Sequence, residues 1–561
     1  MPAKLTKPNF NHYFDYEEVK ACLGGFAAAA PSLCRLFSIG ETHRGRDILM
    51  LEVTDFSSGP SCEKNGLYVD ACTHSEEICG TNAALYLVWH LLSSFDSDES
   101  IRGLLRRAVF YIIPRLNPDG VEYILKLSFP GNGNGRYLPE EFQTGNGLHF
   151  CDIDGDGHIA QMRIQDPDGE WKISDKDPRL MSLRQPWDKQ GPFYRLYPEG
   201  YVQGDTVGFE IPPSRSGNLN RNYPGKWKPE GLQYGGGELP LFEPETGSVA
   251  RFIVAHPNIA GVMSLHTNAA AVMRPFFSLS DENYLGQDLS FFNTIGKMGT
   301  EELGYPVLSF YEHLTPDKSK TRTGALCDWT FDFLGIPSYL VEFWSVYDAA
   351  GTSRPENFHF GAPSEQTEYD VMRWTDKEIG PEGYLPWKPF RHPQLGDVEI
   401  GGRNRIWVER NPPVSYLEDL SEKGSNFILK FAKTLPYFTF LQPTAKKLAD
   451  SIYKVSIITR NSGFMPTNLT AQAEAVHAAP LPYISLSSEG SEILCASHPN
   501  SIPHLAGRFG RIKEWTHDLP NWAPNECRST WIVRTSAERP LFDVTVSCDR
   551  VGTSRCSIDA E

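Results

Sequence analysis

Several short segments of the chain carry side chains that could bind a metal ion, accept a proton or hold an anion. His74 and Glu77 follow an apolar run and open a helical pattern, and His266 lies near the end of the apolar run GVMSLHT. Glu342 lies within a third apolar run, and the segments RLNPDGVEY and LNRNYPGKW add amide and guanidinium groups. Taken singly, each has a structural explanation, such as a hydrogen-bonded histidine, a Pro-Gly turn or a paired buried carboxylate. Their order along the chain is more informative.

The ordered set resembles the M14 family of zinc carboxypeptidases. That family has an H-x-x-E motif, an NPDG turn, an N-R-N segment, a distant His, and an Asp-Trp pair followed 14 residues later by a catalytic Glu. The matching residues here are His74 and Glu77, Asn117–Gly120, Asn220–Asn222, His266, Asp328 with Trp329, and Glu342. The resemblance covers about residues 10 to 345, and more loosely extends to 434. It implies a zinc metallocarboxypeptidase that hydrolyses the C-terminal peptide bond of a peptide substrate.

By this resemblance, one Zn²⁺ is bound by His74, Glu77 and His266. A catalytic zinc with three protein ligands keeps its fourth position for water, and it lowers the pKa of that water from 15.7 to about 7. Glu342 would take the water proton and pass it to the leaving amine, acting first as general base and then as acid. Each ligand is expected at the carboxyl end of a strand, where α/β sheets form their ligand crevices.

The resemblance also implies the groups that hold the substrate. Arg221, with Asn220 beside it, would bind the free C-terminal carboxylate, because a planar guanidinium can form two parallel hydrogen bonds. The family's oxyanion-stabilising Arg follows the NPDG turn, but the loop after Val121 is rewritten here. We predict Arg136 for that role, with Arg163 as the alternative, although both could be surface arginines.

Three positions depart from the family pattern and bear on the substrate. Glu76 stands where many members have Arg, and an anion beside the zinc would disfavour acidic substrate groups. Lys320 replaces the usual Tyr eight residues before the Asp-Trp pair, and it could cap a carboxylate as a point charge. Cys327 falls where the family lines its side-chain pocket, which predicts an apolar or neutral terminal residue.

The elements that must position these residues alternate between strand-like and helical patterns. GLYVDACT (66–73) and AVFYIIPRL (108–116) are apolar runs on either side of a helical pattern, and the same alternation returns over 261–344. It predicts an α/β catalytic domain over 1–434, and the resemblance implies a mixed central sheet flanked by helices. From 435 to 561, short strand-like runs separated by turns predict a C-terminal antiparallel β-sandwich whose partner, if any, stays unknown.

A long insertion, at about residues 128–217, interrupts the catalytic domain. Its glycines, prolines and weak periodicity indicate an ordered insertion without a core of its own. Within it, Asp152, Asp154 and Asp156 follow the first half of a calcium-binding loop, which predicts a structural Ca²⁺ site near the active-site rim. The twelfth loop position is Arg163 instead of Glu, so Asp166 or Asp168 would have to supply the missing oxygens. A solvated acidic turn is the alternative.

Composition limits the other functions. The 561 residues include 53 Lys and Arg against 70 Asp and Glu, a net charge of −17, which argues against extended binding to nucleic acid or to an anionic membrane. No apolar run is long enough to span a membrane. The N-terminus lacks the apolar region of a secretory signal, and 11 scattered cysteines suit free thiols, so we predict a cytoplasmic protein. A related zinc amide hydrolase or deacylase, and an inactive binding module, remain as alternative functions.

Overall fold

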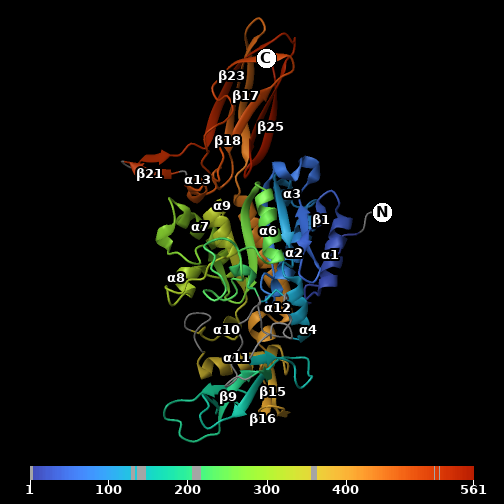
Figure 1. Ribbon diagram of the computed structural model, residues 1–561. Coiled ribbons are helices and arrows are strands. Elements are labelled where there is room, and N and C mark those ends of the chain that lie inside the picture. The colour runs from blue at the N-terminus through green and yellow to red at the C-terminus, as the bar shows by residue number, and fades with distance from the viewer. Residues whose placement is uncertain are drawn as a thin grey trace.

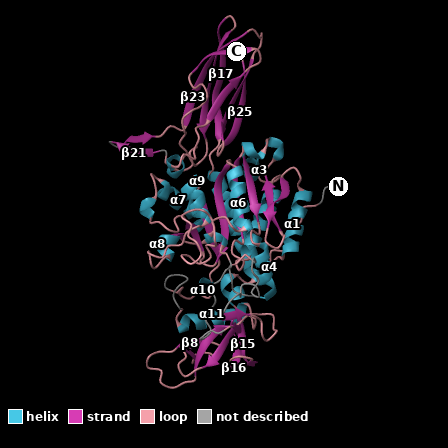
Figure 2. Cartoon of the chain, in the orientation of Figure 1, coloured by secondary structure: helices cyan, strands magenta, loops and turns pink. Residues whose placement is uncertain are grey.

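The computed structural model describes residues 4–127, 133–134, 147–204, 217–355, 363–510, 512–516 and 519–560. Three parts follow one another along the long axis of the molecule (Figure 1): an antiparallel sandwich, a central α/β part and a small antiparallel sheet. Figure 2 shows that the large helices gather in the central part, whereas strands dominate both ends. None of the helices in the described part of the chain is both long and apolar enough to span a bilayer.

The central part is built on an eight-stranded mixed sheet with the order β1-β2-β4-β3-β11-β14-β12-β13. Strands β4, β3, β11 and β14 are mutually parallel, while β2 pairs antiparallel with β1 and β4, and β12 with β14. The mixed central sheet predicted from the resemblance is therefore confirmed. Its strands are β1 (Cys34–Glu41), β2 (Asp47–Val53), β3 (Asn65–Ala71), β4 (Ala108–Ile113), β11 (Ile259–Thr267), β12 (Ala271–Arg274), β13 (Val307–Ser309) and β14 (Ser338–Phe343).

Each face of this sheet buries its own apolar cluster, because side chains alternate along a strand. On β3, Leu67 and Val69 join one cluster and Tyr68 joins the other. The first cluster includes residues of α1, α2, α3, α7 and α12, and the second includes residues of α6 and α9. The helices are α1 (Tyr16–Ala29), α2 (Cys79–Ser94), α3 (Glu99–Arg107), α4 (Pro118–Leu127), α6 (Pro244–Ala255), α7 (Asp288–Leu303), α8 (Phe310–Leu314), α9 (Leu326–Leu334), α10 (Val346–Ala349), α11 (Glu365–Glu378) and α12 (Val414–Thr434).

The small sheet at one end combines the insertion with a distant segment of the chain. Its order is β15-β16-β6-β9-β7-β8, and every pairing is antiparallel. Met162 from the insertion forms a small buried cluster with Val398 and Ile400 of the distant segment, so the insertion shares this cluster with another part of the chain. The strands are β6 (Gln161–Gln165), β7 (Trp171–Ile173), β8 (Met181–Leu183), β9 (Phe193–Pro198), β15 (Tyr384–His392) and β16 (Gly396–Arg403), and β5 (Gly147–Phe150) pairs separately with β10 (Gly200–Gln203).

The opposite end is an antiparallel β-sandwich, as predicted. A four-stranded sheet, β17-β18-β23-β20, and a three-stranded sheet, β19-β24-β25, share one apolar core that includes Val455 and Val544. On the side that faces the central α/β part, Gly335 at the end of α9 approaches α13 (Ala471–Ala475) so closely that a Cβ there would lie 2.2 Å from Ala473 Cα. The sandwich strands are β17 (Phe438–Ala449), β18 (Ile452–Asn461), β19 (Tyr483–Ser487), β20 (Ser491–Ala496), β23 (Glu526–Thr535), β24 (Leu541–Cys548) and β25 (Gly552–Asp559), beside the hairpin β21 (Ile512–Thr516) and β22 (Leu519–Trp522).

Candidate metal centre and active site

The three predicted metal ligands converge at one edge of the central sheet. His74 and Glu77 lie in the loop between β3 and α2, and His266 lies near the carboxyl end of β11, the parallel neighbour of β3. The Glu77 carboxylate lies between the two imidazoles, with Oε1 2.8 Å from His74 Nδ1 and Oε2 2.7 Å from His266 Nδ1. The three ligand atoms lie within 4.8 Å of one another.

The Nε2 atom of each imidazole, which faces away from Glu77, has a hydrogen-bond partner. His74 Nε2 lies 3.1 Å from Asn218 Oδ1, and His266 Nε2 lies 3.0 Å from the hydroxyl of Ser264. Ser264 in turn donates to the buried carboxylate of Asp70. These bonds orient the rings so that both Nδ1 atoms face Glu77, which is how outer groups orient metal-binding histidines. Two imidazoles and one carboxylate held in this way fit a zinc ion with one open position.

Other parts of the chain hold the ligand loop in place. Asn117, from the NPDG turn, donates to the carbonyl of Thr73, directly before His74, at 3.3 Å. On the other side, Asn411 Oδ1 accepts from the backbone N–H groups of Ile78 at 2.9 Å and of Cys79 at 3.1 Å, where α2 begins. The loop that carries two ligands is therefore fixed both by the motif and by a segment far along the chain.

Glu342 faces the same space as the ligands. It lies opposite His266 in the parallel register of β11 and β14, so both side chains leave the sheet on one face. Its Oε2 is buried and has no hydrogen-bond partner among the described residues. Burial and the negative charge of Glu77 raise the pKa of Glu342 to about 8. A dication beside it would oppose that shift, because an opposite charge favours the carboxylate.

Charge also dominates Glu77 itself. Burial alone would raise the pKa of Glu77, but the adjacent His74 and His266 outweigh burial and hold that pKa below its usual range. The carboxylate is thus anionic at neutral pH, as a metal ligand must be.

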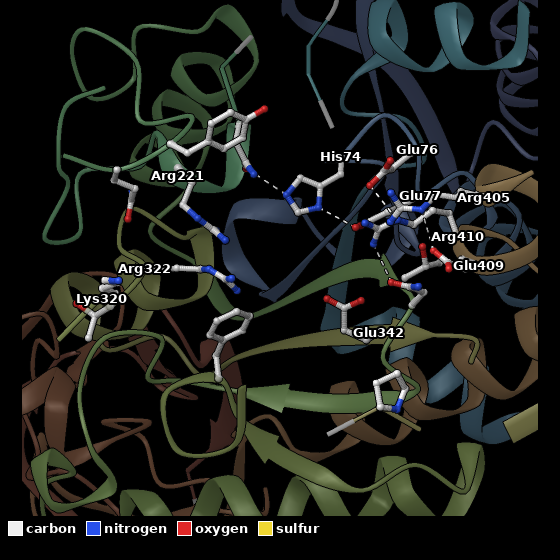
Figure 3. Close-up of a pocket in the computed structure, with 18 of the residues that line it drawn as sticks. His74, Glu76, Glu77, Arg221, Lys320, Arg322, Glu342, Arg405, Glu409 and Arg410 are labelled. Atoms are coloured by element: carbon white, nitrogen blue, oxygen red, sulfur yellow. Dashed lines mark hydrogen bonds and ion pairs between the residues drawn. The ribbon is translucent and has the colours of Figure 1, made fainter. Parts of the chain in front are cut away.

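The metal ligands and Glu342 open into a cavity of about 930 Å³. Figure 3 shows two groups of charged side chains on opposite sides of His74. The first group, here called the cationic wall, comprises Arg221, Lys228, Lys320 and Arg322. The second group, here called the ion-paired wall, comprises Glu76, Arg403, Arg405, Glu409 and Arg410. The metal centre lies between the two walls.

On the cationic wall, the structure brings two of the predicted substrate-binding residues to the cavity. Arg221 lines it and donates from Nη1 to the carbonyl of Asn220 at 2.6 Å. Burial, followed by the charge of Arg322, lowers the pKa of Arg221 to about 9. Lys320 lies at the cavity mouth, where its side chain is 83% exposed and 3.6 Å from Asp317.

Asn220 has a different position from the one its predicted role suggests. Its residue is buried, and its Oδ1 accepts from the backbone N–H of Leu326 at 3.0 Å, at the start of α9. Asn218, which the sequence analysis missed, lines the cavity and holds His74. The available signal was its position, since Asn218 is an amide residue two positions before the N-R-N segment.

On the ion-paired wall, acidic and basic groups are in direct contact. Arg410 Nε lies 3.0 Å from Glu76 Oε1, and Arg403 Nη2 lies 2.6 Å from Glu409 Oε1. Burial would raise the pKa of Glu409, but the neighbouring arginines lower it to about 2. The sequence did not identify Arg403 or Arg410 as cavity residues. The available signal for Arg410 was the pair of charged residues, Glu409 and Arg410, at the end of the otherwise apolar segment Ile406–Arg410.

Three other residues that we predicted for the active site are not found among the described residues that line the cavity. Cys327 is 2% exposed and belongs to an apolar cluster, and it is not among the described residues that line the cavity. Arg163, the alternative oxyanion group, lies in β6 with Nε 2.7 Å from Glu399 and its guanidinium 4.6 Å from the ring of Trp387. It is therefore a structural arginine of the small sheet. Arg136 lies outside the described residues.

The three aspartates of the predicted calcium loop do gather. Carboxylate oxygens of Asp152, Asp154 and Asp156 lie within 4.8 Å of one another. Each also accepts a backbone N–H of the same loop; Asp152, for example, accepts from Gly155 at 2.7 Å. Asp166, which we expected to complete the loop, instead lies 2.9 Å from Arg195.

Fold and site together define a class of protein: an α/β architecture with a mixed central sheet and a candidate mononuclear centre of two histidines and one glutamate. Residues 19–366, more than half of the chain, match the family model described as zinc carboxypeptidase. The chain therefore belongs to the zinc carboxypeptidase family, as the resemblance indicated. Residues 438–559, which form the sandwich, match a model described as a domain of unknown function.

The matches to individual curated proteins cover short segments of the chain. The chain is 30% identical over 121 residues to zinc carboxypeptidase A 1 of Drosophila melanogaster, and 31% identical over 127 residues to the inactive metallocarboxypeptidase ecm14 of Schizosaccharomyces pombe. These segments span 21% and 22% of this chain, and 27% and 26% of the two relatives. A crystal structure of thrombin activatable fibrinolysis inhibitor shows 16% identity and a TM-score of 0.43, covering 76% of each chain.

Proposed function

We propose that this protein is an active, zinc-dependent metallocarboxypeptidase that releases the C-terminal residue of a peptide. The observation that supports this most directly is the convergence of His74, Glu77 and His266, with the buried Glu342 Oε2 aimed at the same space. A binding protein has no need of an unpartnered buried carboxyl at this place, because burying one without a hydrogen bond is costly.

In this proposal each residue has one task. Bound zinc would polarise a carbonyl and lower the pKa of a water molecule. Glu342 accepts the proton of the attacking water and then donates it to the leaving amine. Arg221 holds the terminal carboxylate of the substrate, so that the last peptide bond lies beside Glu342. Ser264 and Asn218 keep the imidazoles oriented throughout.

The test is hydrolysis of blocked dipeptides by purified protein of known zinc content. We expect release of free C-terminal amino acids that stops with a chelator and returns with Zn²⁺. The variant Glu342→Gln is the matched control: it keeps the side-chain shape and all three ligands, so it should bind zinc but lose at least a factor of about 100 in kcat. A fully active Glu342→Gln variant would contradict the general-base role.

Two other outcomes separate the alternatives. Hydrolysis only when the terminal carboxylate is amidated or missing would favour a deacylase or related amide hydrolase. The insertion residue Gln161, which lines the cavity, keeps that alternative open. Zinc-loaded protein without any hydrolysis would favour a binding module, and one similar protein is named as inactive.

We also propose Ca²⁺ binding at Asp152, Asp154 and Asp156, as a structural site separate from the zinc centre. The clustered oxygens support it, and carboxylate oxygens are ligands that Ca²⁺ prefers. Glu199, a buried carboxylate, braces the same loop by accepting from Ile153 N at 2.6 Å. Calorimetric titration of metal-free protein with CaCl₂ should show one binding event, which Asp154→Asn should weaken. Absence of calcium-linked heat or stabilisation would favour a solvated turn.

A cytoplasmic location remains a proposal as well. All 11 cysteines are free in the structure, which suits a reducing compartment. Fractionation of the source cells tests it, and recovery of the protein outside the cytoplasm would contradict it.

A further inference from the structure

The cationic wall brings two guanidinium groups to the same side of the cavity. Among the described residues, all four charged side chains on that side of the cavity are basic, and two of them, Arg221 and Arg322, lie close together in Figure 3. The charge of Arg322 contributes to the lowered pKa of Arg221, which reports the same proximity. A substrate anion bound beside both guanidiniums would reduce the repulsion between these two like charges.

The two guanidiniums come from different elements and are held in different ways. Arg221 belongs to the short turn Leu219–Arg221 and is tied to the Asn220 carbonyl. Arg322 lies between α8 and α9, with its guanidinium 4.9 Å from the ring centre of Phe310, which itself stacks on Phe277. The aromatic face of Phe310 holds the plane of the Arg322 guanidinium in position.

One terminal carboxylate carries one charge and can accept two parallel hydrogen bonds from one guanidinium. If Arg221 takes that carboxylate, Arg322 faces the side chain of the same terminal residue. We propose that Arg322 binds a side-chain carboxylate there, so that the protein prefers peptides ending in Asp or Glu. This inference rests on the proposed function and names its substrate class.

The two reasons for expecting another substrate do not hold in the structure. Glu76 does not present an uncompensated anion to the substrate, because Arg410 lies 3.0 Å from it. Cys327 does not make an apolar lining, because it is buried in a cluster away from the described cavity residues. The charge that remains near the substrate on the cationic wall is positive, and it attracts acidic terminal residues.

Peptides ending in Glu and in Gln give the sharpest test, because the two residues have the same shape and differ in charge. We expect wild-type protein to show a kcat/KM at least 10-fold higher for blocked dipeptides ending in Glu than for those ending in Gln. Arg322→Gln should lower kcat/KM for Glu by 10- to 100-fold and change it for Gln by less than 3-fold. Retained activity on the Gln peptide shows that this variant is folded.

The control variant is Lys226→Gln, which removes a nearby positive charge that is not among the described cavity-lining residues and lies 2.8 Å from Asp332. It should change the Glu/Gln ratio by less than 3-fold. An equal loss on both peptides in Arg322→Gln would overturn the inference, since both arginines would then hold the terminal carboxylate. A wild-type preference for Gln or for apolar residues would overturn it too.

A binding measurement keeps the inference testable if the protein proves inactive. Calorimetry on Glu342→Gln protein with N-acetylglutamate and N-acetylglutamine needs no turnover. We expect the glutamate derivative to bind at least 10-fold more tightly, and Arg322→Gln to remove the difference. Equal affinities in the parent protein would refute the acidic preference, whereas absent hydrolysis with a retained difference would refute only the proposed function.

Discussion

On one side of the metal centre, Glu76 and Glu409 are each in contact with an arginine; on the other, the described charged residues are all cations. A buried acid-base pair satisfies itself and leaves little attraction for a ligand, so the ion-paired wall holds the fold together. Repulsion between adjacent cations raises the free energy of the cavity. Binding of an anion lowers that free energy again. The contrast lies in the sign of the charges that line each side of the cavity: mixed beside Glu76 and positive around Arg221.

Breaking a pair on the ion-paired wall should have the largest effect. Glu76→Ala leaves Arg410 beside the metal centre without its carboxylate, and the loss of one partner of a buried pair typically costs about 3–5 kcal/mol. Urea unfolding of zinc-saturated protein measures this loss. Lys423→Ala is the control, because it breaks an exposed helical pair, with side chains 42% and 64% exposed, and should cost less than about 0.5 kcal/mol. Equal losses of unfolding free energy in Glu76→Ala and Lys423→Ala would contradict a structural role for the ion-paired wall.

A cation on the other wall should behave in the opposite way. Arg221→Gln would remove the proposed charge-assisted bonds to the substrate carboxylate, each worth about 1.5–3 kcal/mol, so kcat/KM should fall about 100-fold. The free energy of unfolding should stay the same or rise, because repulsion from Arg322 is relieved. Steady-state kinetics and urea unfolding of the same preparation check both parts, and a stability loss like that of Glu76→Ala would contradict the comparison.

A third kind of charged group lies where the central part meets the β-sandwich. There, among the described residues, a buried carboxylate is bound by backbone N–H groups and not by a cation. Asp288 accepts from Ala471 N at 2.9 Å and Gln472 N at 3.0 Å, and burial raises its pKa to about 6. The folded protein therefore holds this proton more tightly than the unfolded chain does. Stability from Asp288 is greatest below about pH 4 and falls by about 2 kcal/mol as the pH rises to about 6.

Unfolding of the wild type and of Asp288→Asn between pH 4 and 7 tests this dependence. The difference in unfolding free energy between the two proteins should change in favour of Asp288→Asn as the pH rises. A constant difference would show that Asp288 ionises equally in the folded and unfolded states.

The smallest effect is expected at the cavity mouth. Lys320 is 83% exposed, so solvent and salt screen its charge. Lys320→Ala should lower kcat/KM for Glu-terminated peptides by less than about 3-fold, and 0.5 M NaCl should remove the difference. A loss as large as that of Arg322→Gln would mean that the anion is bound nearer the mouth.

The sequence predicted what local patterns and spaced motifs encode. His74, Glu77, His266 and Glu342 were recognised because their order along the chain, together with the other motifs, resembles that of a known family. Apolar runs beside these motifs indicated the strands of the sheet, and they are the buried strands β3, β11 and β14. The sandwich was recognised from short strand-like runs between turns. In each case the residues that carry the signal are close neighbours in the sequence or belong to a recognised set.

Contacts between distant segments could not be predicted in the same way. β6 pairs with β16, from Arg163 opposite Glu399 to Gln161 opposite Gly401, and nothing local in either strand names its partner. The same holds for Arg410, which reaches Glu76 from a part of the chain without a motif. Arg322 was passed over because an isolated arginine in a polar loop has no spacing pattern until the fold places Arg221 beside it.

The region matched by the zinc carboxypeptidase model ends at residue 366, yet Arg410 and Asn411 come after it. They supply the counter-ion of Glu76 and the acceptor that begins α2. Two relatives could therefore share every motif up to 366 and still differ in the electrostatics beside the metal. Sorting such relatives by their cavity chemistry calls for a comparison that includes this late turn, and a fragment cut at residue 366 would lack one side of the cavity.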